Sequence, residues 1–205
     1  MPQEYEYAFY NYDKEEIISK IKALGAVKKG VYLFKVQVFI HPTKKPGSYI
    51  RVRDEGYKIT MTYKTYDKKK EFDDEHEIII NDFNTGVNIL LGLGCTKKYY
   101  YEKIREIWIM NNIEVVFDSM PGIPEYMEIE CTSKGILQTI MKKLKLIKEP
   151  RKSSSYEDLY GIILKNIQVD FKSLVKKIRP MAKKNKKLFD EITKQQLSIY
   201  KKIKK

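Results

Sequence analysis

Acidic side chains recur at two-residue spacing in three places along this chain of 205 residues. The doublets are Glu4/Glu6 in EYEYAF, Glu75/Glu77 in DEHEIII and Glu128/Glu130 in EYMEIEC. Each lies in a segment that reads as a strand, and strand side chains alternate between two faces. Each doublet therefore directs both carboxylates to one face, where their oxygens could bind a divalent cation such as Mg²⁺ or Mn²⁺.

Basic side chains follow the same even spacing. They are Arg51/Arg53 in YIRVRD, Lys58 and Lys64 on either side of Thr60 and Thr62, and Lys103/Arg105 in YEKIREIW. Any single doublet could be the solvent-facing side of an ordinary strand. Here, however, some strands are wholly acidic and others wholly basic. If these strands curve around one cavity, carboxylates can hold divalent cations while Arg and Lys neutralise phosphate oxygens, as a bound polyphosphate requires.

The charge is distributed unevenly along the chain. The net charge is +13, but residues 166–205 hold 13 Lys and Arg against three acidic residues, and residues 1–165 are nearly balanced. We therefore expect a tunnel domain over 1–165 and a basic helical C-terminal extension over 166–205. The extension could bind RNA or another anionic partner, or it could be a solvated lysine-rich helix.

No apolar run approaches the ~20 residues that span a bilayer, and the N-terminus MPQEYEY lacks signal-peptide character. We expect a cytoplasmic protein without a membrane partner. The hydrophobic content of 42% is sufficient for a packed core. The oligomeric state does not follow from the sequence.

The sequence predicts about eight strands and four or five helices. Strands are expected in EYEYAFYNY and at 31–40, 49–54, 57–66, 74–81, 97–110, 113–118 and 125–131. Helices are expected from Asp13 to Gly25, over 82–94 and 133–146, from Ser155 onward, and from Asp170 onward, where an apolar stripe precedes Pro180. Short connections imply antiparallel pairing. The predicted fold is α+β, an eight-stranded antiparallel, closed or nearly closed β-barrel tunnel with flanking helices and a polar interior.

The order of these motifs resembles the CYTH superfamily, also called triphosphate tunnel metalloenzymes. The order is Glu-x-Glu, Arg-x-Arg, Lys-x-Thr-x-x-x-Lys, Glu-x-Glu, Lys-x-Arg, an Asp after a hairpin, a Pro-Gly loop and a final Glu-x-Glu. The resemblance runs from Glu4 to about Gly161 and includes the stretch RKSSSYEDLYG. The superfamily includes class IV adenylyl cyclases, thiamine triphosphatases and inorganic triphosphatases.

The resemblance implies roles for individual side chains. The residues that would bind the triphosphate are Arg51, Arg53, Lys58, Lys64, Lys103 and Arg105. The residues that would bind the metal are Glu4, Glu6, Glu128 and Glu130, joined by Glu75, Glu77 and Asp118, which could instead hold the basic residues in place. Glu130, Glu114 and Lys103 are the expected catalytic residues.

One position departs from the family motif Glu-x-Glu-x-Lys, because Ala8 stands where the lysine belongs. Loss of this lysine would slow the chemistry or change the substrate, or leave a tunnel that only binds. Tyr10 follows on the same face of the strand and could reach into the space.

The leading functional hypothesis is a metal-dependent phosphohydrolase of the CYTH type. Its small-molecule substrate would contain a triphosphate, whether inorganic, thiamine or nucleoside, with Mg²⁺ or Mn²⁺ as the cofactor. One alternative is a class IV adenylyl cyclase that converts ATP to cyclic AMP and pyrophosphate. Others are RNA 5′-triphosphate processing and a catalytically weakened protein that binds triphosphate or nucleotide.

Overall fold

Eight antiparallel strands form one sheet in the computed structural model, which describes residues 5–43, 47–66, 73–147, 159–160, 168–182 and 185–204. The strands are β1 (Tyr5–Phe9), β2 (Val27–Ile40), β3 (Ser48–Asp54), β4 (Ile59–Tyr66), β5 (Asp73–Ile80), β6 (Thr96–Met110), β7 (Ile113–Ser119) and β8 (Tyr126–Cys131). Their order across the sheet is β1-β8-β7-β6-β2-β3-β4-β5. The predicted eight-stranded antiparallel sheet is confirmed.

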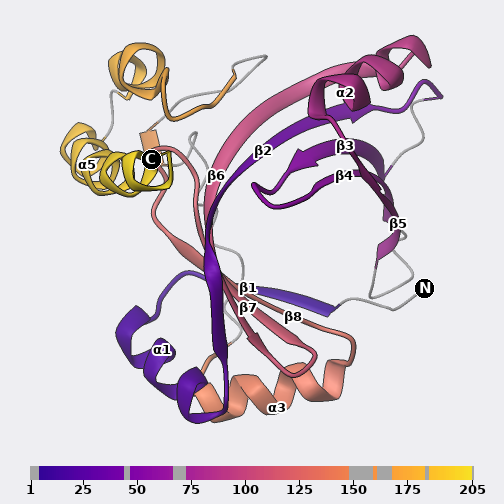
Figure 1. Cartoon of the computed structure of the whole chain (residues 1–205). Helices are drawn as coiled ribbons and strands as arrows, with labels where there is room; N and C mark the ends of the chain where they lie inside the picture. The colour runs from indigo at the N-terminus through magenta and orange to yellow at the C-terminus, as the bar shows by residue number, and fades with distance from the viewer. Residues whose placement is uncertain are drawn as a thin grey trace.

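The sheet curls around a central space instead of lying flat (Figure 1). Its edges are β1 and β5, and no pairing between described residues joins them. The long strands β2 and β6, of 14 and 15 residues, pair with each other and connect the two halves of the curl. This is the nearly closed form of the predicted barrel, and it leaves one face of every strand directed inward.

Three helices follow the predicted ranges closely. Asp13 caps α1 (Lys14–Ala23) by accepting a hydrogen bond of 2.9 Å from the Glu16 amide. Asp82 caps α2 (Phe83–Gly92) in the same way through the Thr85 amide. The third, α3 (Lys134–Leu144), ends where Lys145 adopts a positive φ of 58°. No helix among the described residues is long and apolar enough to cross a membrane.

These helices cover the outer face of the sheet. α1 and α3 pack on β1, β7 and β8 through a core that includes Ile21, Phe117, Ile129 and Leu137 (Figure 1). α2 covers the outer face of β3 and β4, where Val87 and Leu90 pack with Val52. Because the helices bury the apolar outer faces, the charged inner faces remain turned toward the central space.

The C-terminal segment is largely helical, as expected from Asp170 onward, but it is not one continuous helix. A π-helical turn, Leu174–Ile178, passes into a 3₁₀ turn, Arg179–Met181, and a long helix α5 (Lys186–Ile203) follows. Pro180 lacks a backbone donor and clashes with the preceding turn, so a regular α-helix does not continue through it. α5 lies within the predicted basic helical extension over 166–205, although its own bounds were not predicted. The helix expected from Ser155 lies largely outside the described residues.

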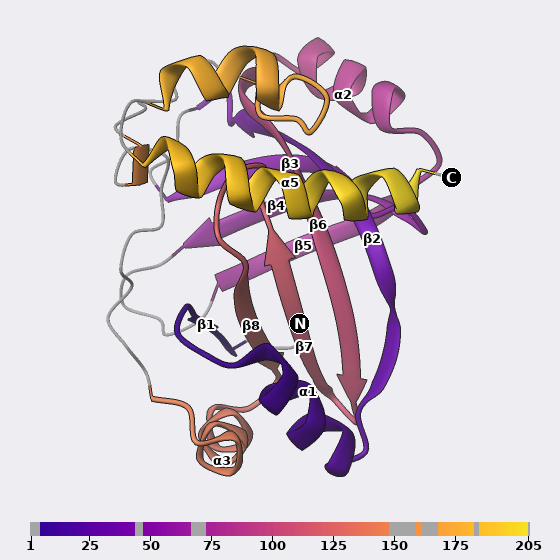
Figure 2. The ribbon, with the colours of Figure 1, turned by 90° about the vertical axis from the view of Figure 1, so that its left-hand side faces the viewer.

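The described part of this segment packs on the outside of the sheet (Figure 2). The Gln196 amide donates to the carbonyls of Met120 (2.8 Å) and Ile123 (2.9 Å) and accepts from the Gly122 amide (2.7 Å). Phe171 and Tyr200 pack with residues of β2 and β6. The predicted basic extension is therefore joined to the sheet by buried contacts. Binding of RNA or an anionic partner by its lysines stays a prediction.

We expect Phe189→Ala to destabilise the protein by about 3–5 kcal/mol, because it removes a fully buried ring that packs edge-on against Tyr160 at 5.2 Å. Urea denaturation would measure the loss. Lys194→Ala, an exposed position on the same helix, is the control and should change the free energy of unfolding by less than about 0.5 kcal/mol. Equal stabilities for the two variants would mean that α5 does not contribute to the fold.

Candidate active site

The inner faces of the strands enclose a cavity of about 510 Å³ with almost entirely polar walls. Its described lining residues are Glu6, Phe34, Tyr49, Arg51, Arg53, Glu55, Tyr57, Lys58, Lys64, Glu75, Glu77, Tyr101, Lys103, Arg105, Glu114, Tyr126, Glu128 and Glu130. The strand period of two explains the arrangement, because each charged doublet turns both members inward. The curled sheet thus brings together side chains from strands far apart in the sequence.

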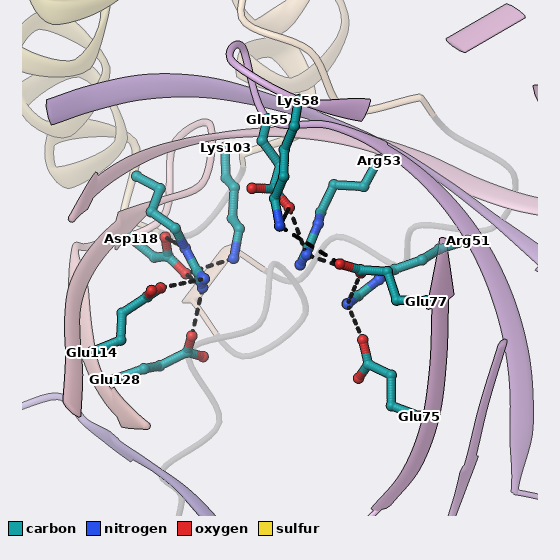
Figure 3. A network of polar contacts seen from close by, with 11 residues as sticks. Arg51, Arg53, Glu55, Lys58, Glu75, Glu77, Lys103, Glu114, Asp118 and Glu128 are labelled. Atoms are coloured by element: carbon teal, nitrogen blue, oxygen red, sulfur yellow. Dashed lines mark hydrogen bonds and ion pairs between the residues drawn. The ribbon is translucent and has the colours of Figure 1, made fainter. Parts of the chain in front are cut away.

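One half of the cavity is built on β6, β7 and β8. The Asp118 carboxylate accepts hydrogen bonds from Lys103 Nζ (2.6 Å), Arg105 Nε (2.7 Å) and Arg105 Nη2 (2.6 Å). Arg105 Nη2 also donates to Glu128 at 2.7 Å (Figure 3). Asp118 is completely buried, directly behind the cavity lining. Its observed contacts are those of a residue that holds two basic side chains in place.

The electrostatics of this half follow from burial and pairing. Burial alone would raise the pKa of Asp118, but Lys103 and Arg105 outweigh it and lower that pKa to about 2. Burial would lower the pKa of Arg105, and the adjacent Asp118 carboxylate instead raises it. For Lys103 burial prevails and the pKa is lowered. Arg105 is therefore a permanent cation, whereas Lys103 loses its proton more readily than a lysine in water.

The opposite half is built on β3, β4 and β5 (Figure 3). Arg51 donates to Glu75 at 2.9 Å, and Arg53 donates to Glu77 at 3.3 Å. Glu77 also accepts from the Thr62 hydroxyl at 2.8 Å, while Lys64 lies 3.2 Å from Glu75. In the described structure, Glu75 and Glu77 thus hold the basic residues of this half.

Glu55 is a cavity residue that sequence reasoning missed. It follows Asp54 in the turn between β3 and β4, where Gly56 adopts a positive φ of 86°, and a charged turn residue is ordinarily exposed. Yet Glu55 is only 2% exposed, with Arg53 Nη2 at 2.6 Å and Lys58 Nζ at 3.7 Å. The only feature of the sequence that could have marked Glu55 as a cavity residue is its position two residues after the Arg51/Arg53 doublet.

Phe34 is the second missed residue. Its ring lies within 5.4–5.8 Å of the charged groups of Arg53, Lys103 and Arg105, so one aromatic ring contacts cations from both halves. The predicted strand 31–40 is rich in apolar residues on both faces, and nothing in its pattern marked Phe34 as a site residue. Phe34 lies between the two sets of cations because β2 pairs with β3 on one side and with β6 on the other.

A row of carboxylates marks one end of the cavity. Glu6 on β1 pairs with Glu130 on β8, which pairs with Glu114 on β7, so three carboxylates project side by side. Burial, followed by repulsion from Glu6, raises the pKa of Glu128 to about 7. Burial also raises the pKa of Glu114. Both carboxylates therefore hold a proton more readily than an exposed glutamate, mainly because they are buried.

These donors fit a hard divalent cation, which prefers carboxylate oxygens and would relieve the repulsion. The fit is one of chemistry and proximity. Among the described residues, no group of three or more His, Cys, Asp or Glu side chains is already arranged to hold a metal ion. Glu4, expected to be a ligand, lies outside the described residues. The ligand roles of Glu6, Glu128 and Glu130 stay predictions.

The balance of charge also bears on what the cavity can bind. Its described lining residues include seven glutamates and six Lys or Arg side chains. The protein cations alone therefore cannot neutralise a bound triphosphate, which brings several further negative charges. Divalent cations that enter with the phosphates would supply the missing positive charge.

Ala8 lies opposite Glu128 in the pairing of β1 with β8, so the position of the missing motif lysine lies beside a cavity carboxylate. Tyr10 packs against Tyr126, with ring centroids 5.8 Å apart, and is not among the described lining residues. The suggestion that Tyr10 reaches into the space is not supported, because Tyr10 lines a separate hollow with Phe9 and Asn11. The charge of the motif lysine is not replaced from this position.

Most predicted site residues thus meet in one place. Twelve line the cavity, namely Glu6, Arg51, Arg53, Lys58, Lys64, Glu75, Glu77, Lys103, Arg105, Glu114, Glu128 and Glu130. Asp118 lies just behind it. Their proximity is observed, whereas their individual roles in binding and catalysis stay predictions.

The sequence and the fold both relate this chain to known proteins. The model of the CYTH domain matches residues 3–158, and the chain therefore belongs to the CYTH family. A Methanocaldococcus jannaschii protein named "Putative adenylate cyclase MJ0240" is 26% identical over 167 residues, which cover 73% of this chain and 94% of that protein.

Solved structures share the fold. The PH1012 protein of Pyrococcus horikoshii is 24% identical with a TM-score of 0.60, and the match covers 72% of this chain and 92% of that one. A Vibrio parahaemolyticus protein named as a "putative adenylate cyclase" is 13% identical with a TM-score of 0.64, covering 78% of this chain and 98% of that one. The CYTH family includes triphosphatases and adenylyl cyclases and is in general metal-dependent.

We expect Asp118→Asn to destabilise the protein by about 3–5 kcal/mol at neutral pH, because it leaves Lys103 and Arg105 buried without their shared carboxylate. Thermal or urea denaturation would measure the change. Glu125→Gln is the matched control. It removes a partly exposed carboxylate paired with Lys14 and should cost less than about 1 kcal/mol.

The same variant carries a pH signature. Since the Asp118 pKa is lowered from 3.8 to about 2 on folding, its stabilisation is present above pH 4 and is lost as the pH falls toward 2. The loss of stability over this interval should be shallower in Asp118→Asn. Identical acid titration curves for variant and wild type would contradict the assigned ion pairs.

Proposed function

We propose that this protein is a metal-dependent triphosphatase that hydrolyses the terminal phosphoryl group of a substrate bound in the cavity. One observation carries the proposal. Six basic side chains from β3, β4 and β6 and the turn between β3 and β4 meet in a single cavity, next to a row of carboxylates from β1, β7 and β8. Such a cavity matches a polyphosphate with its divalent cations and little else.

Binding would proceed by exchange of partners. In the described structure the basic side chains are paired with carboxylates, for example Arg51 with Glu75 and Arg105 with Glu128. Phosphate oxygens would take over donors of the arginines, whose planar groups suit two parallel hydrogen bonds to one phosphate. Asp118 and Glu55, both almost fully buried, would keep the side chains oriented during the exchange.

Divalent cations fit the carboxylate end of the cavity, where Glu6, Glu128 and Glu130 would hold them, with Glu4 as a further ligand implied by the family motif. Mg²⁺ or Mn²⁺ bound there would withdraw charge from the phosphate oxygens and lower the pKa of water. The raised pKa of Glu128, at about 7, implies that a proton competes with the cation for this carboxylate near neutral pH.

Hydrolysis requires a proton acceptor near the attacking water and positive charge near the leaving oxygen. Glu114 suits the first role, because burial raises its pKa and makes it a better base than an exposed glutamate. Glu130 lies opposite it on β8 and is the other candidate. Lys103 and Arg105, held by Asp118, would stabilise charge that develops on the leaving phosphate.

Cyclisation of ATP is the second candidate, favoured by the adenylate cyclase name of the Methanocaldococcus jannaschii relative. It would use the same basic residues but needs the ribose 3′ oxygen positioned at the α-phosphorus. Among the described lining residues only Phe34 lacks a polar side-chain atom, and it is 2% exposed beneath three cations. The cavity therefore offers phosphate contacts in much greater number than apolar contacts for a nucleoside.

We expect orthophosphate as the product when the purified protein is incubated with Mg²⁺ or Mn²⁺ and with tripolyphosphate, thiamine triphosphate, ATP or a 5′-triphosphorylated RNA. Chromatography would separate orthophosphate, pyrophosphate and cyclic AMP. EDTA should abolish turnover. Cyclic AMP with pyrophosphate and no orthophosphate would replace hydrolysis by cyclisation. Tight binding without any product would instead indicate a binding protein weakened by Ala8.

We expect Glu130→Gln to lose turnover while its melting temperature stays near that of the wild type, because the amide keeps the shape but not the charge of the carboxylate. Kinetics and calorimetry on the same preparation would test this. Glu125→Gln, whose side chain pairs with Lys14 and is not among the described lining residues, should retain wild-type turnover. Full activity of Glu130→Gln would remove this residue from the site.

We expect Arg53→Ala to lower kcat/KM by the equivalent of about 2–4 kcal/mol, as loss of a charge-assisted contact in an enclosed site does. Because Arg53 also pairs with buried Glu55, the melting temperature must be measured alongside. Arg53→Lys keeps the charge and should recover part of the loss. The control is Lys142→Ala on α3, an exposed position outside the described cavity lining.

A further inference from the structure

The loop between β7 and β8 is buried, although a turn that contains Pro and Gly ordinarily lies at the surface. It spans residues 120–125, and Gly122 in it adopts a positive φ of 75°. Pro121, Gly122 and Ile123 are all buried. Phe189 of α5 lies so close to Gly122 that a Cβ atom there would overlap its ring. The C-terminal segment therefore covers this loop.

One side chain of α5 bonds three peptide groups of the covered loop. The Gln196 amide, itself only 4% exposed, donates to the Met120 and Ile123 carbonyls and accepts from the Gly122 amide. The Tyr160 hydroxyl donates to the Gly122 carbonyl. Because a buried peptide group without a partner is unfavourable, the conformation of the loop depends on the Gln196 amide.

The loop joins two residues of the candidate site. Asp118 near the end of β7 is paired with Tyr126 at the start of β8, and the loop connects the two strands just beyond this pair. Asp118 holds Lys103 and Arg105, whereas Tyr126 lines the cavity. A shift of the loop would therefore move the carboxylate that orients two of the cavity cations.

The C-terminal segment also contacts β6, the strand that carries those cations. Beyond the part of β6 that pairs with β7, the Val169 amide donates to the Tyr100 carbonyl at 3.1 Å and the Val169 carbonyl accepts from the Glu102 amide at 2.8 Å. The Glu102 carboxylate, which is 7% exposed, accepts from the Phe171 amide at 2.9 Å. Lys103 follows Glu102 directly, so the segment is bonded to β6 next to a cavity lysine.

We propose that Gln196 and Glu102 are positioning residues, through which the C-terminal segment holds the cluster of Lys103, Arg105 and Asp118 in the orientation that binds phosphate. This inference rests on the proposed triphosphate-binding function. Neither Gln196 nor Glu102 is among the described lining residues, so both act on the substrate only through the cluster. The segment lies beyond residue 158, where the match to the CYTH domain ends, and the support therefore comes from outside the matched domain.

The test measures how tightly the full-length chain binds imidotriphosphate, a tripolyphosphate analogue whose NH bridges resist hydrolysis, by calorimetry with Mg²⁺ present. Gln196→Met nearly keeps the size of the side chain and removes its three hydrogen bonds. It should weaken binding roughly 3- to 30-fold, the size of effects passed through packed side chains. The matched control is Gln195→Met, at the neighbouring exposed position of α5, which should change the affinity less than about twofold.

Coupling to individual lysines separates positioning from a general loosening of the fold. Lys103→Met removes a cation of the supported cluster but leaves Asp118 paired with Arg105, whereas Lys64→Met removes a cation from β4 in the opposite half of the cavity. The effects of Gln196→Met and Lys103→Met on the binding free energy should be non-additive, and those of Gln196→Met and Lys64→Met should be additive. Equal coupling to both lysines would overturn the proposal.

Gln196→Asn is the second variant, for use if Gln196→Met does not fold. It retains an amide but is one methylene shorter, so it should bond fewer of the three peptide groups and weaken binding in the same direction. Wild-type affinity in the folded variant would overturn the proposal.

Binding of the analogue does not depend on turnover, so the two possible failures can be told apart. If the wild type binds the analogue but releases no orthophosphate from tripolyphosphate, hydrolysis is refuted, while weaker binding by Gln196→Met still supports the positioning role. If hydrolysis is intact and Gln196→Met binds as tightly as Gln195→Met, the positioning role alone is refuted. A wild type that does not bind the analogue would overturn both.

Discussion

The structure depends on neutralising charge inside a curled sheet. Six basic side chains point into the cavity. Carboxylates, many of them from neighbouring strands, lie beside them and neutralise their charge. The most enclosed example is Asp118, which is fully buried and accepts three hydrogen bonds from Lys103 and Arg105. An unpaired charge at such a position would be severely destabilising, so the acidic and basic strands have to be neighbours.

This constraint explains how one fold can be both stable and open to an anion. Pairs such as Arg51–Glu75 lie at the cavity wall, where, under the proposed function, a phosphate would replace the carboxylate. Pairs made by the buried carboxylates Asp118 and Glu55 lie behind the wall and keep the cations oriented. Under the proposed function, the excess of glutamates over basic residues at the wall would make divalent cations a part of the binding reaction.

Most apolar burial lies on the outer face, and a smaller apolar cluster of Phe34, Ile107 and Val116 includes the cavity wall. α1, α2 and α3 cover the outside of the sheet, and the C-terminal segment covers β2 and β6 through Phe171, Tyr200 and the hydrogen bonds of Gln196 (Figure 2). Much of the apolar packing that stabilises the protein therefore lies outside the sheet, which leaves most of the inner face polar. The lysine-rich composition of the C-terminal segment concealed its structural contribution, because exposed lysines and a buried stripe occupy the same helix.

The sequence by itself determined the strands, their antiparallel pairing and the inward charges, because a period of two and short turns are local properties. It also revealed the family through the order of its motifs. Only the tertiary structure decided which charges pair, since Asp118 meets Lys103 and Arg105 through the pairing of β6 with β7. The same holds for the burial of Glu55 and for Phe34 beneath three cations, because contacts between distant strands depend on how the sheet curls and leave no pattern along the chain.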